Sequence, residues 1–454
     1  MIKTSAIFLF LNYCLGKKVN MSMIVAKIDW RQLYNFASRQ ALLGFCFDGI
    51  ERMTKEFSEE LKQNPMGRDL LMTWMGAAQQ IRRQNMKVNA VAVKLYSKFR
   101  EDGLRCCILK GQGNALMYPN PYSRTPGDID VWIVASRERI MEYAQKKFEL
   151  EDDIRLQHLE TSLDGVPVEL HFFPCSMNNP IYHARLQKWF RRNADLQCSH
   201  IVRLPDGAGD IAIPTTAFNV VYQLTHLYHH FFDEGIGMRQ IIDYFLVVND
   251  FSKNVFLNTD FSNPSVSLSK GSSTSHPSPL SSEERDVTAL RCSEPLRSKD
   301  DGASKPSPNC AGWDRRGVSG DIASDASVSS AFTTDSSAST ALDVVQRELK
   351  YLGLWKFAGA VMYVLKEVLG LSEDKMIVPM DEKRGRLLLA EILNGGNFGQ
   401  HFTKYAGFTH QSMGKKYFLK IWRNMHFVRY YPAEALSEPL FRTWHFFWRV
   451  KNKK

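Results

Sequence analysis

The sequence predicts an α+β fold in which a small mixed β-sheet is flanked by N-terminal and C-terminal helical regions. Three observations carry this prediction. Short apolar stretches of strand length gather between residues 101 and 215. The residues on either side repeat apolar side chains at helical spacing. A Ser-rich stretch, residues 254–341, separates the helical patterns and cannot bury a core, so we expect it to be a disordered insertion.

The chain of 454 residues is too long for one ordinary hydrophobic core, which favours several structural units. We expect the following segments in order: residues 1–28 as an extended start or weak targeting segment, 29–100 as a helical region, 101–215 as the sheet core, 216–253 as a helical segment packing on it, 254–341 as the insertion, and 342–454 as the C-terminal helical region.

Composition limits the classes of function. The formal net charge of +10 favours an anionic partner, such as a nucleotide, a nucleic acid, a phosphorylated sugar or a membrane surface. Eight cysteines without a CxxC pair predict reduced thiols, and we expect a cytoplasmic protein. No stretch approaches the roughly 18 apolar residues of a membrane-spanning helix, so no transmembrane segment is expected.

The first elements lead to a glycine-bearing turn. Helical patterns run from Asp29 to about Phe99, and residues 104–109 then form a short apolar strand. The turn Lys110-Gly111-Gln112-Gly113 follows and opens a short helix. Backbone N–H groups in such a turn suit phosphate oxygens.

Two carboxylates stand one residue apart on the next predicted strand, residues 127–133. Because side chains alternate along a strand, Asp128 and Asp130 point to the same face, and the apolar residues between them point to the other. Two adjacent carboxylates repel unless a cation lies between them. This pair therefore indicates a site for a hard divalent cation, above all magnesium.

A third carboxylate lies on the strand predicted for residues 166–172, where Glu169 and His171 share the polar face. Helices are expected over 138–148, 216–232 and 237–248, and again over 349–369, 414–426 and 440–451. In the second helical group, Arg239 and Asp243 are one turn apart and are expected to pair.

These residues resemble the nucleotidyltransferase superfamily with a DNA polymerase β-like fold. The likeness is closest to a bacterial family of uncharacterised nucleotidyltransferases, and it runs from about Trp30 to the C-terminus without the Ser-rich stretch. The shared motifs are Leu109-Lys110-Gly111, Tyr118-Pro119, Arg124, Gly127-Asp128-Ile129-Asp130, Val168-Glu169-Leu170-His171 and Gly237-Met238-Arg239-Gln240. The second glycine-turn position, usually Gly or Ser, is Gln112 here.

The resemblance implies transfer of a nucleoside monophosphate from a nucleoside triphosphate to a hydroxyl or phosphate acceptor. Asp128, Asp130 and Glu169 would be the catalytic residues and would hold Mg²⁺ or Mn²⁺. The residues expected to bind substrate are Lys110, Gly111, Gln112, Gly113, Arg124, His171 and Arg239. The acceptor stays open among a small molecule, a polysaccharide precursor, a protein and RNA.

Four other interpretations remain. The chain could be an inactive nucleotide- or RNA-binding protein on the same fold, or a toxin that modifies tRNA ends. His226, His229, His230 and Asp233 invite a zinc interpretation, although residues facing the core or the active site fit their spacing better. The aromatic and basic C-terminal segment could contact RNA or a membrane surface, or supply core side chains.

Overall fold

Four short strands form the sheet around which the chain is organised. A computed structural model describes residues 2–150, 155–259, 340–401 and 413–452. The strands are β1 (Cys106–Leu109), β2 (Ile129–Ile133), β3 (His158–Leu163) and β4 (Val166–His171). Their order across the sheet is β1-β2-β4-β3, with β2 and β4 parallel and the other two pairs antiparallel. The predicted mixed sheet and the α+β class are confirmed.

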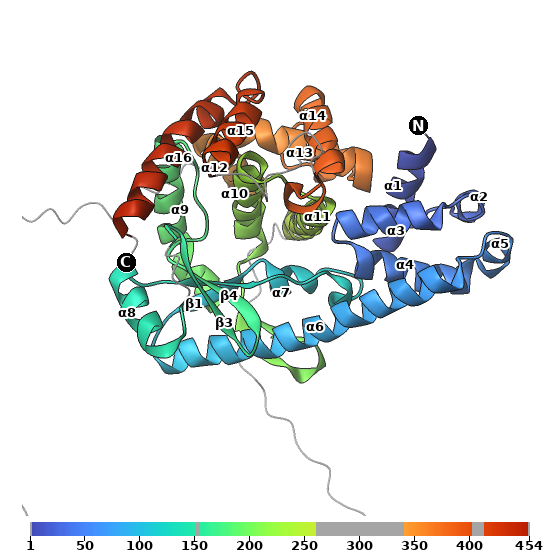
Figure 1. Ribbon diagram of the computed structural model, residues 1–454, viewed down its shortest axis with the longest axis horizontal. Coiled ribbons are helices and arrows are strands. Elements are labelled where there is room, and N and C mark those ends of the chain that lie inside the picture. The colour runs from blue at the N-terminus through green and yellow to red at the C-terminus, as the bar shows by residue number, and fades with distance from the viewer. Residues whose placement is uncertain (1, 151–154, 260–339, 402–412, 453–454) are drawn as a thin grey trace, which may run out of the picture. The chain divides into compact units, whose positions relative to one another are not determined.

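Helices precede the sheet and cover it (Figure 1). Up to β4 they are α1 (Ile2–Cys14), α2 (Ser22–Val25), α3 (Trp30–Arg39), α4 (Leu43–Glu56), α5 (Ser58–Gln63), α6 (Arg68–Glu101), α7 (Gly111–Ala115) and α8 (Arg137–Lys147). The long helix α6 packs against β1 and β4 and against the hairpin of β5 (Ile201–Leu204) and β6 (Gly209–Ala212).

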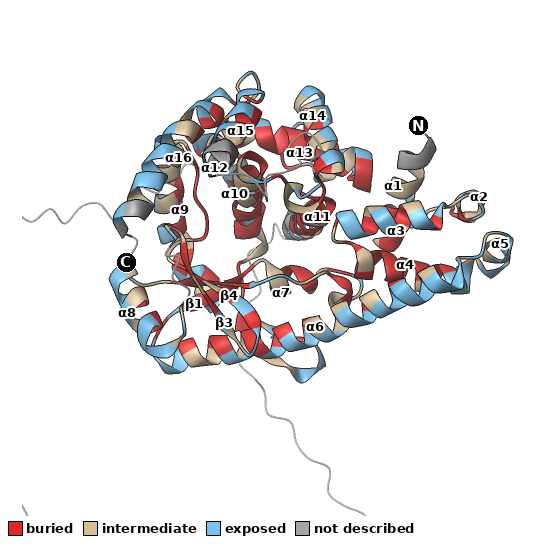
Figure 2. Cartoon of the chain, in the orientation of Figure 1, coloured by how far each residue is buried: buried red, intermediate tan, exposed pale blue. Residues whose placement is uncertain are grey.

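The remaining helices follow β4. They are α9 (Pro180–Ser199), α10 (Thr216–Asp233), α11 (Met238–Thr259), α12 (Ala341–Tyr351), α13 (Trp355–Leu369), α14 (Glu382–Gly395), α15 (Met413–Met425) and α16 (Pro432–Asn452). Short 3₁₀ turns lie at η1 (Pro121–Ser123), η2 (Pro205–Gly207), η3 (Glu373–Lys375) and η4 (Asn397–Gly399). Figure 2 shows that α10, α11 and α13 are largely buried.

Both faces of β2 are covered, which the sequence pattern did not predict. All five residues of β2 are buried, including Trp132 on the same face as Asp130. The Trp132 ring stacks on Phe218 of α10, and Trp189 of α9 stacks on the same phenylalanine at a centroid distance of 4.6 Å. These aromatic contacts fix α10 across the acidic face of the sheet, and they thereby position the rest of the site.

Some helix boundaries differ from the prediction. The stretch 349–369 was expected to be one helix, but residues 352–354 divide it into α12 and α13. Gly353 has φ of +72°, and a Cβ there would meet the ring of Tyr182 at 2.5 Å, so a glycine turn is required. Strand β3 and helix α9 were not predicted at all.

The N-terminal residues belong to the folded part of the chain. In α1, Phe10 and Leu11 are buried, and the helix packs against α4 and α13. Asn12 Nδ2 donates to the carbonyl oxygen of Val368 at 2.8 Å. A targeting role for residues 1–28 stays a prediction.

The predicted insertion lies mostly outside the described residues, which omit 260–339. At its edges, α11 extends to Thr259, and Thr340 caps α12 through a reciprocal pair of hydrogen bonds with Asp343. Among the helices that the structure describes, none combines the length and apolar character needed to cross a bilayer.

Candidate functional site

The strand register places the acidic residues together. Asp130 on β2 lies directly opposite Glu169 on the parallel strand β4, and opposite Leu109 at the end of β1. Asp128 precedes β2 by one residue and is exposed. One oxygen from each of the three carboxylates falls in a group whose atoms all lie within 4.8 Å of one another.

Asp130 is held from two sides. Its Oδ1 lies 3.0 Å from Lys110 Nζ and 2.9 Å from His171 Nε2. Burial alone would raise the pKa of Asp130, but the Lys110 charge and the His171 hydrogen bond outweigh it and lower this pKa below its ordinary value. The Asp130 side chain is therefore ionised, and its two contacts hold it in one orientation.

Lys110 reaches Asp130 because the chain turns sharply after β1. Lys110 itself has φ of +50°, a conformation that residues with a side chain rarely adopt. Burial would lower the pKa of Lys110, but the nearby carboxylates, Asp130 first, raise it overall. The lysine is therefore a partly buried cation at the centre of the site.

Asp128 differs from Asp130 in its charge balance. The negative charge of Asp130, and after it that of Glu169, raises the pKa of Asp128 from 3.8 to about 6. Proximity of like charges has this effect on one member of a carboxylate pair. The chain's own cations therefore leave part of the acidic charge uncompensated, and an additional cation would fit there.

His171 links the two strands. Its Nε2 lies 3.1 Å from Glu169 Oε2 as well as 2.9 Å from Asp130 Oδ1. Burial would lower the pKa of His171, but the hydrogen bonds to the two carboxylates raise it to about 9. For Glu169, burial raises the pKa and the hydrogen bond from His171 lowers it, with a net lowering. His171 thus orients both carboxylates.

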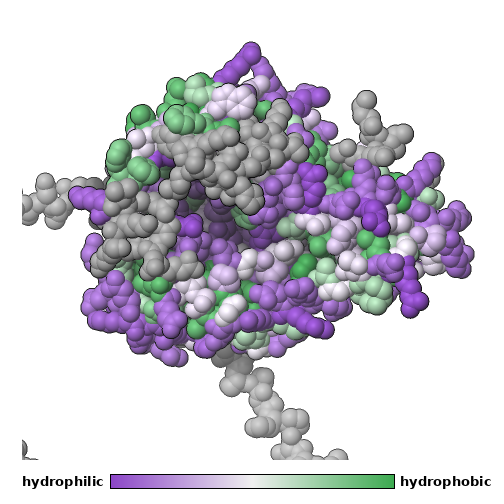
Figure 3. Space-filling view, in the orientation of Figure 1, coloured by the Kyte–Doolittle hydropathy of each residue, from purple (hydrophilic) through white to green (hydrophobic). Residues whose placement is uncertain are grey.

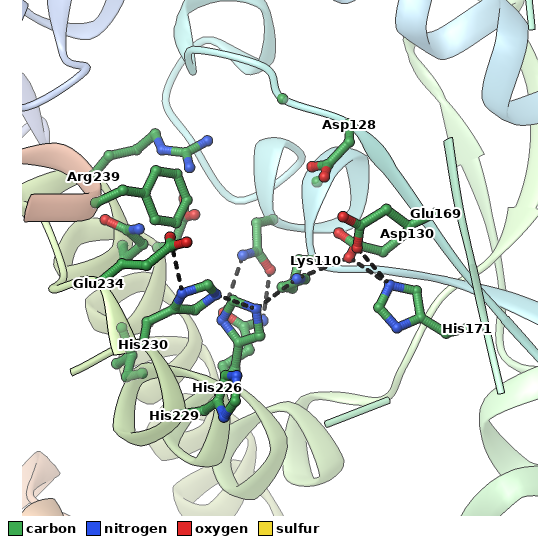
Figure 4. Close-up of a pocket in the computed structure, with 18 of the residues that line it drawn as sticks. Lys110, Asp128, Asp130, Glu169, His171, His226, His229, His230, Glu234 and Arg239 are labelled. Carbon is green, nitrogen blue, oxygen red and sulfur yellow. Dashed lines mark hydrogen bonds and ion pairs between the residues drawn. The ribbon is translucent and has the colours of Figure 1, made fainter. Parts of the chain in front are cut away.

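Helix α10 contributes three histidines (Figure 4). His226 Nε2 accepts a hydrogen bond from Lys110 Nζ at 2.7 Å and lies 3.1 Å from His230 Nε2. Burial, and after it the Lys110 charge, lower the pKa of His226 well below its ordinary value. These histidines and His229 line the cavity, so they face the site. Within the described ranges they belong to no group with metal-ligand spacing.

Arg124 and Arg239 reach the site from a loop and from α11. Arg124 forms two hydrogen bonds to Asp243, from Nε at 2.9 Å and from a terminal nitrogen at 2.8 Å, and Tyr118 donates to the same carboxylate at 2.7 Å. The expected Arg239–Asp243 pair is therefore replaced by Arg124–Asp243. Arg239 instead donates to the backbone oxygen of Thr125 at 3.0 Å.

Gln112 and Gly113 lie away from the cavity. The Gln112 side chain is buried and donates to Asn89 Oδ1. A Cβ on Gly113 would meet Ile213 at 3.2 Å, so this glycine permits close packing of α7. Neither residue lines the cavity, although the sequence pattern placed both in the substrate-binding turn.

The remaining predicted site residues surround one cavity of about 300 Å³. It is lined by Lys110, Gly111, Arg124, Asp128, Asp130, Glu169, His171 and Arg239, among others. Figure 3 shows a hollow lined by hydrophilic residues between α10 and the sheet. In Figure 4 Arg239 and Glu234 lie on one side of the view, and Asp128 and Glu169 lie on the other.

Sequence reasoning missed several cavity residues, including Asn114, Arg155, Gln157, His158, Gln223, Glu234 and Phe398. His158 is the most informative, because it opens the unpredicted strand β3 and pairs directly with His171. The sequence does contain a signal for strand β3. Asp164-Gly165 forms a two-residue turn between two alternating stretches, which is typical of a β-hairpin.

A small mixed sheet with three converging carboxylates is the arrangement expected of a nucleotidyltransferase. The family model described as an uncharacterised nucleotidyltransferase matches residues 26–260, more than half of the chain. The chain belongs to this family.

The crystal structure of an antigenic nucleotidyltransferase-like protein from Paracoccidioides brasiliensis is similar to 36% of this chain and 75% of that chain, with 16% identity and a TM-score of 0.25. A search of curated proteins finds no match.

Proposed function

We propose that the chain is a metal-dependent nucleotidyltransferase that moves a nucleoside monophosphate from a nucleoside triphosphate to a hydroxyl or phosphate acceptor. The observation that carries the proposal is the convergence of Asp128, Asp130 and Glu169 in one cavity that cationic side chains also line. Membership of a nucleotidyltransferase family supports the same reaction class.

The donor set fits a hard divalent cation. Asp128, Asp130 and Glu169 offer carboxylate oxygens, which Mg²⁺ and Mn²⁺ prefer, and the raised pKa of Asp128 reports uncompensated negative charge. When bound, such cations would neutralise triphosphate charge and polarise the acceptor. Asp130 would be positioned for this role by Lys110 and His171.

The cationic side chains would bind the triphosphate. Lys110, Arg124, Arg155 and Arg239 all line the cavity. The Nε atom of Arg239 is buried, and it makes no hydrogen bond to any part of the chain that the structure describes. A buried guanidinium N–H without an acceptor is unfavourable, and a phosphate oxygen would satisfy it.

Glu169 would help remove the proton from an acceptor hydroxyl. Its Oε2 is held by His171 at 3.1 Å, and its lowered pKa keeps the side chain ionised in the free protein. The acceptor itself is not specified by these residues. Because the cavity is polar and lies beside the sheet, we expect the reacting group to enter there, whether it belongs to a small molecule, a polysaccharide precursor, a protein or RNA.

The test uses the purified full chain with Mg²⁺, each nucleoside triphosphate labelled on its α-phosphate, and a cell extract as the acceptor pool. We expect pyrophosphate release and a labelled product. Asp130→Asn should lower turnover at least about a thousandfold, because it removes a charged group on which the transition state depends.

Asp164→Asn is the matched control. Asp164 lies in the turn between β3 and β4 with φ of +52°, which asparagine adopts readily, and it pairs with Lys94 on the surface. This control should keep wild-type turnover. Nucleotide binding without turnover of any triphosphate would reject the proposal in favour of an inactive nucleotide-binding protein.

A further inference from the structure

A second group of possible metal ligands lies beside the acidic cluster. His158, Glu169 and His171 each offer one ligand atom, and these atoms all lie within 4.8 Å of one another. The two histidines face each other on adjacent strands, with ring centroids 5.0 Å apart. This donor set differs from the neighbouring three carboxylates, because two of its three ligands are imidazoles.

The contacts converge on one carboxylate oxygen. Glu169 Oε2 lies 3.1 Å from His171 Nε2 and 3.4 Å from His158 Nδ1. Ligands about 2.1 Å from a tetrahedral zinc ion are separated from each other by about 3.4 Å. The two separations are therefore near those of a formed site, and small side-chain movements would complete it.

His158 is otherwise difficult to explain. It is 8% exposed, and neither ring nitrogen makes a hydrogen bond within the described residues. Buried polar atoms are normally satisfied, so an imidazole left in this state indicates a missing partner. Its Nδ1 points toward Glu169 and His171, where a cation would provide that partner.

The opposite side of the His158 ring supports this orientation. Nε2 faces Glu160 Oε1 at 3.5 Å, and Glu160 is in turn paired with Arg155 at 2.7 Å. Histidine ligands usually direct their second ring nitrogen toward a carboxylate or carbonyl, which fixes the ring and its tautomer. A proton on Nε2 leaves the Nδ1 lone pair available to a metal.

We propose that His158, His171 and Glu169 form a binding site for a divalent transition-metal ion of the zinc type, next to the proposed magnesium site of the acidic cluster. Two imidazoles and one carboxylate are a ligand set typical of Zn²⁺ and related ions, whereas Mg²⁺ prefers oxygen ligands. Glu169 is shared between the two groups. Both histidines contact Oε2 of Glu169, and neither contact involves Oε1, the second oxygen of the same carboxylate.

The experiment uses metal-depleted, tag-free full-length protein without nucleotide, titrated with Co²⁺ as a visible probe and with Zn²⁺ as competitor. We expect one Co²⁺ per chain with the intense absorption of a low-coordinate site, displaced by Zn²⁺ but not by millimolar Mg²⁺. His158→Gln should weaken Co²⁺ binding at least about a hundredfold, since loss of a ligand costs more than loss of an outer partner.

Two variants serve as controls. His426→Gln changes an exposed histidine whose Nδ1 lies near the carbonyl oxygen of Trp422, and it should leave Co²⁺ binding unchanged. Asp128→Asn alters only the acidic cluster and should retain the Co²⁺ spectrum. Loss of Co²⁺ binding on His226→Gln together with its retention on His158→Gln would overturn the assignment, because the α10 histidines would then be the ligands.

X-ray absorption of the zinc-loaded wild-type protein tests the same point without a variant. We expect two imidazole ligands and one or more oxygen ligands at about 2.0–2.2 Å. A spectrum with oxygen ligands alone would exclude the site. Because neither measurement requires nucleotide or turnover, failure of the proposed transfer reaction would leave this result unchanged, and the reverse also holds.

Discussion

Lys110 Nζ lies 3.0 Å from Asp130 Oδ1, so the glycine-turn lysine neutralises the central carboxylate of the acidic cluster. This contact follows from the pairing of Leu109 with Asp130 at the end of β1. Sequence reasoning assigned Lys110 to a phosphate by its charge alone. In the free protein the lysine ammonium instead lies beside Asp130, where it competes with a bound metal cation for the carboxylate.

Replacing Lys110 by methionine should change the affinities for Mn²⁺ and for nucleotide in opposite directions. Mn²⁺ affinity in the absence of nucleotide should rise about tenfold, because a positive charge beside Asp130 is removed. Nucleotide affinity should fall, because the proposed contact between Lys110 and the triphosphate is lost. Mn²⁺ binding is measured by electron paramagnetic resonance, and nucleotide binding by calorimetry.

Lys94→Met is the matched control for this prediction. Lys94 pairs with Asp164 on the surface at 2.8 Å, so its loss removes the same charge at a distance from the cavity. Neither affinity should change by more than about twofold, because exposed pairs interact weakly. Weaker Mn²⁺ binding by Lys110→Met would contradict the competition between lysine and metal.

The buried Arg124–Asp243 pair should stabilise the loop that leads to Asp128. Both side chains are almost fully buried, at 4% and 7% exposed. Arg124→Met should lower the free energy of unfolding by about 3–5 kcal/mol, since the substitution leaves an unpaired buried carboxylate. Urea denaturation measures this change.

The double variant Arg124→Met/Asp243→Asn tests the cause. It should recover most of the lost stability, because no unpaired charge remains and the asparagine oxygen still accepts the hydrogen bond from Tyr118. If the double variant were as unstable as Arg124→Met, the loss would reflect packing and not the stranded carboxylate.

Gln112 should affect stability more than substrate binding. Its buried side chain donates to Asn89, which belongs to α6, and it does not line the cavity. Gln112→Leu should cost about 1–3 kcal/mol, because Asn89 Oδ1 would lose its hydrogen-bond donor in the interior. Thermal unfolding and nucleotide titration on the same samples separate the two effects. Wild-type stability with weakened nucleotide binding would restore the original interpretation of Gln112 as a phosphate ligand.

The sequence predicted the acidic cluster because it depends on local alternation. Asp128 and Asp130 share a face by strand periodicity, and Glu169 follows the same rule on its own strand. The parallel pairing of β2 with β4 then brings Asp130 opposite Glu169. The order of the motifs along the chain was sufficient to predict that Asp128, Asp130 and Glu169 lie close together. It was also sufficient to predict the α+β class.

The surroundings of the cluster depend on contacts that no local pattern contains. His226 approaches Lys110 only because α10 crosses the sheet, and α10 is held there by the stacking of Phe218 on Trp132. Arg239 and Asp243 have the helical spacing of an ion pair, yet Asp243 forms its ion pair with Arg124, which lies in a loop distant in the sequence. A buried, bidentate ion pair is stronger than an ion pair between neighbours on one helix face. Tertiary packing therefore decided these pairs.

Glu434 of α16 connects the C-terminal helices to the sheet region. It is 1% exposed and accepts hydrogen bonds from the backbone N–H groups of Asn178 and Asn179, at 2.6 and 3.2 Å, just before α9. Burial raises the pKa of Glu434 from 4.5 to about 7, although these hydrogen bonds oppose the shift. The folded protein therefore binds a proton here more tightly than the unfolded chain does.

The sign of the resulting pH dependence follows directly. Between pH 4.5 and about 7, the folded state holds a proton on Glu434 that the unfolded state has released. The contribution of this residue to stability therefore falls as pH rises through that window, by at most about 1.4 kcal/mol per pH unit. Glu434→Gln does not ionise, and it keeps one acceptor oxygen, so that one of the two backbone N–H groups retains its acceptor.

We therefore expect the stability of Glu434→Gln to depend less on pH between 4.5 and 8, so that the variant gains stability relative to the wild-type protein as pH rises. Glu434→Ala should be less stable than wild type at low pH, because it leaves two buried N–H groups without an acceptor. Urea denaturation at several pH values measures all three proteins. A glutamine variant that keeps the wild-type slope would show that other groups produce the dependence, and one that loses stability relative to wild type as pH rises would show that the ionised carboxylate stabilises the start of α9.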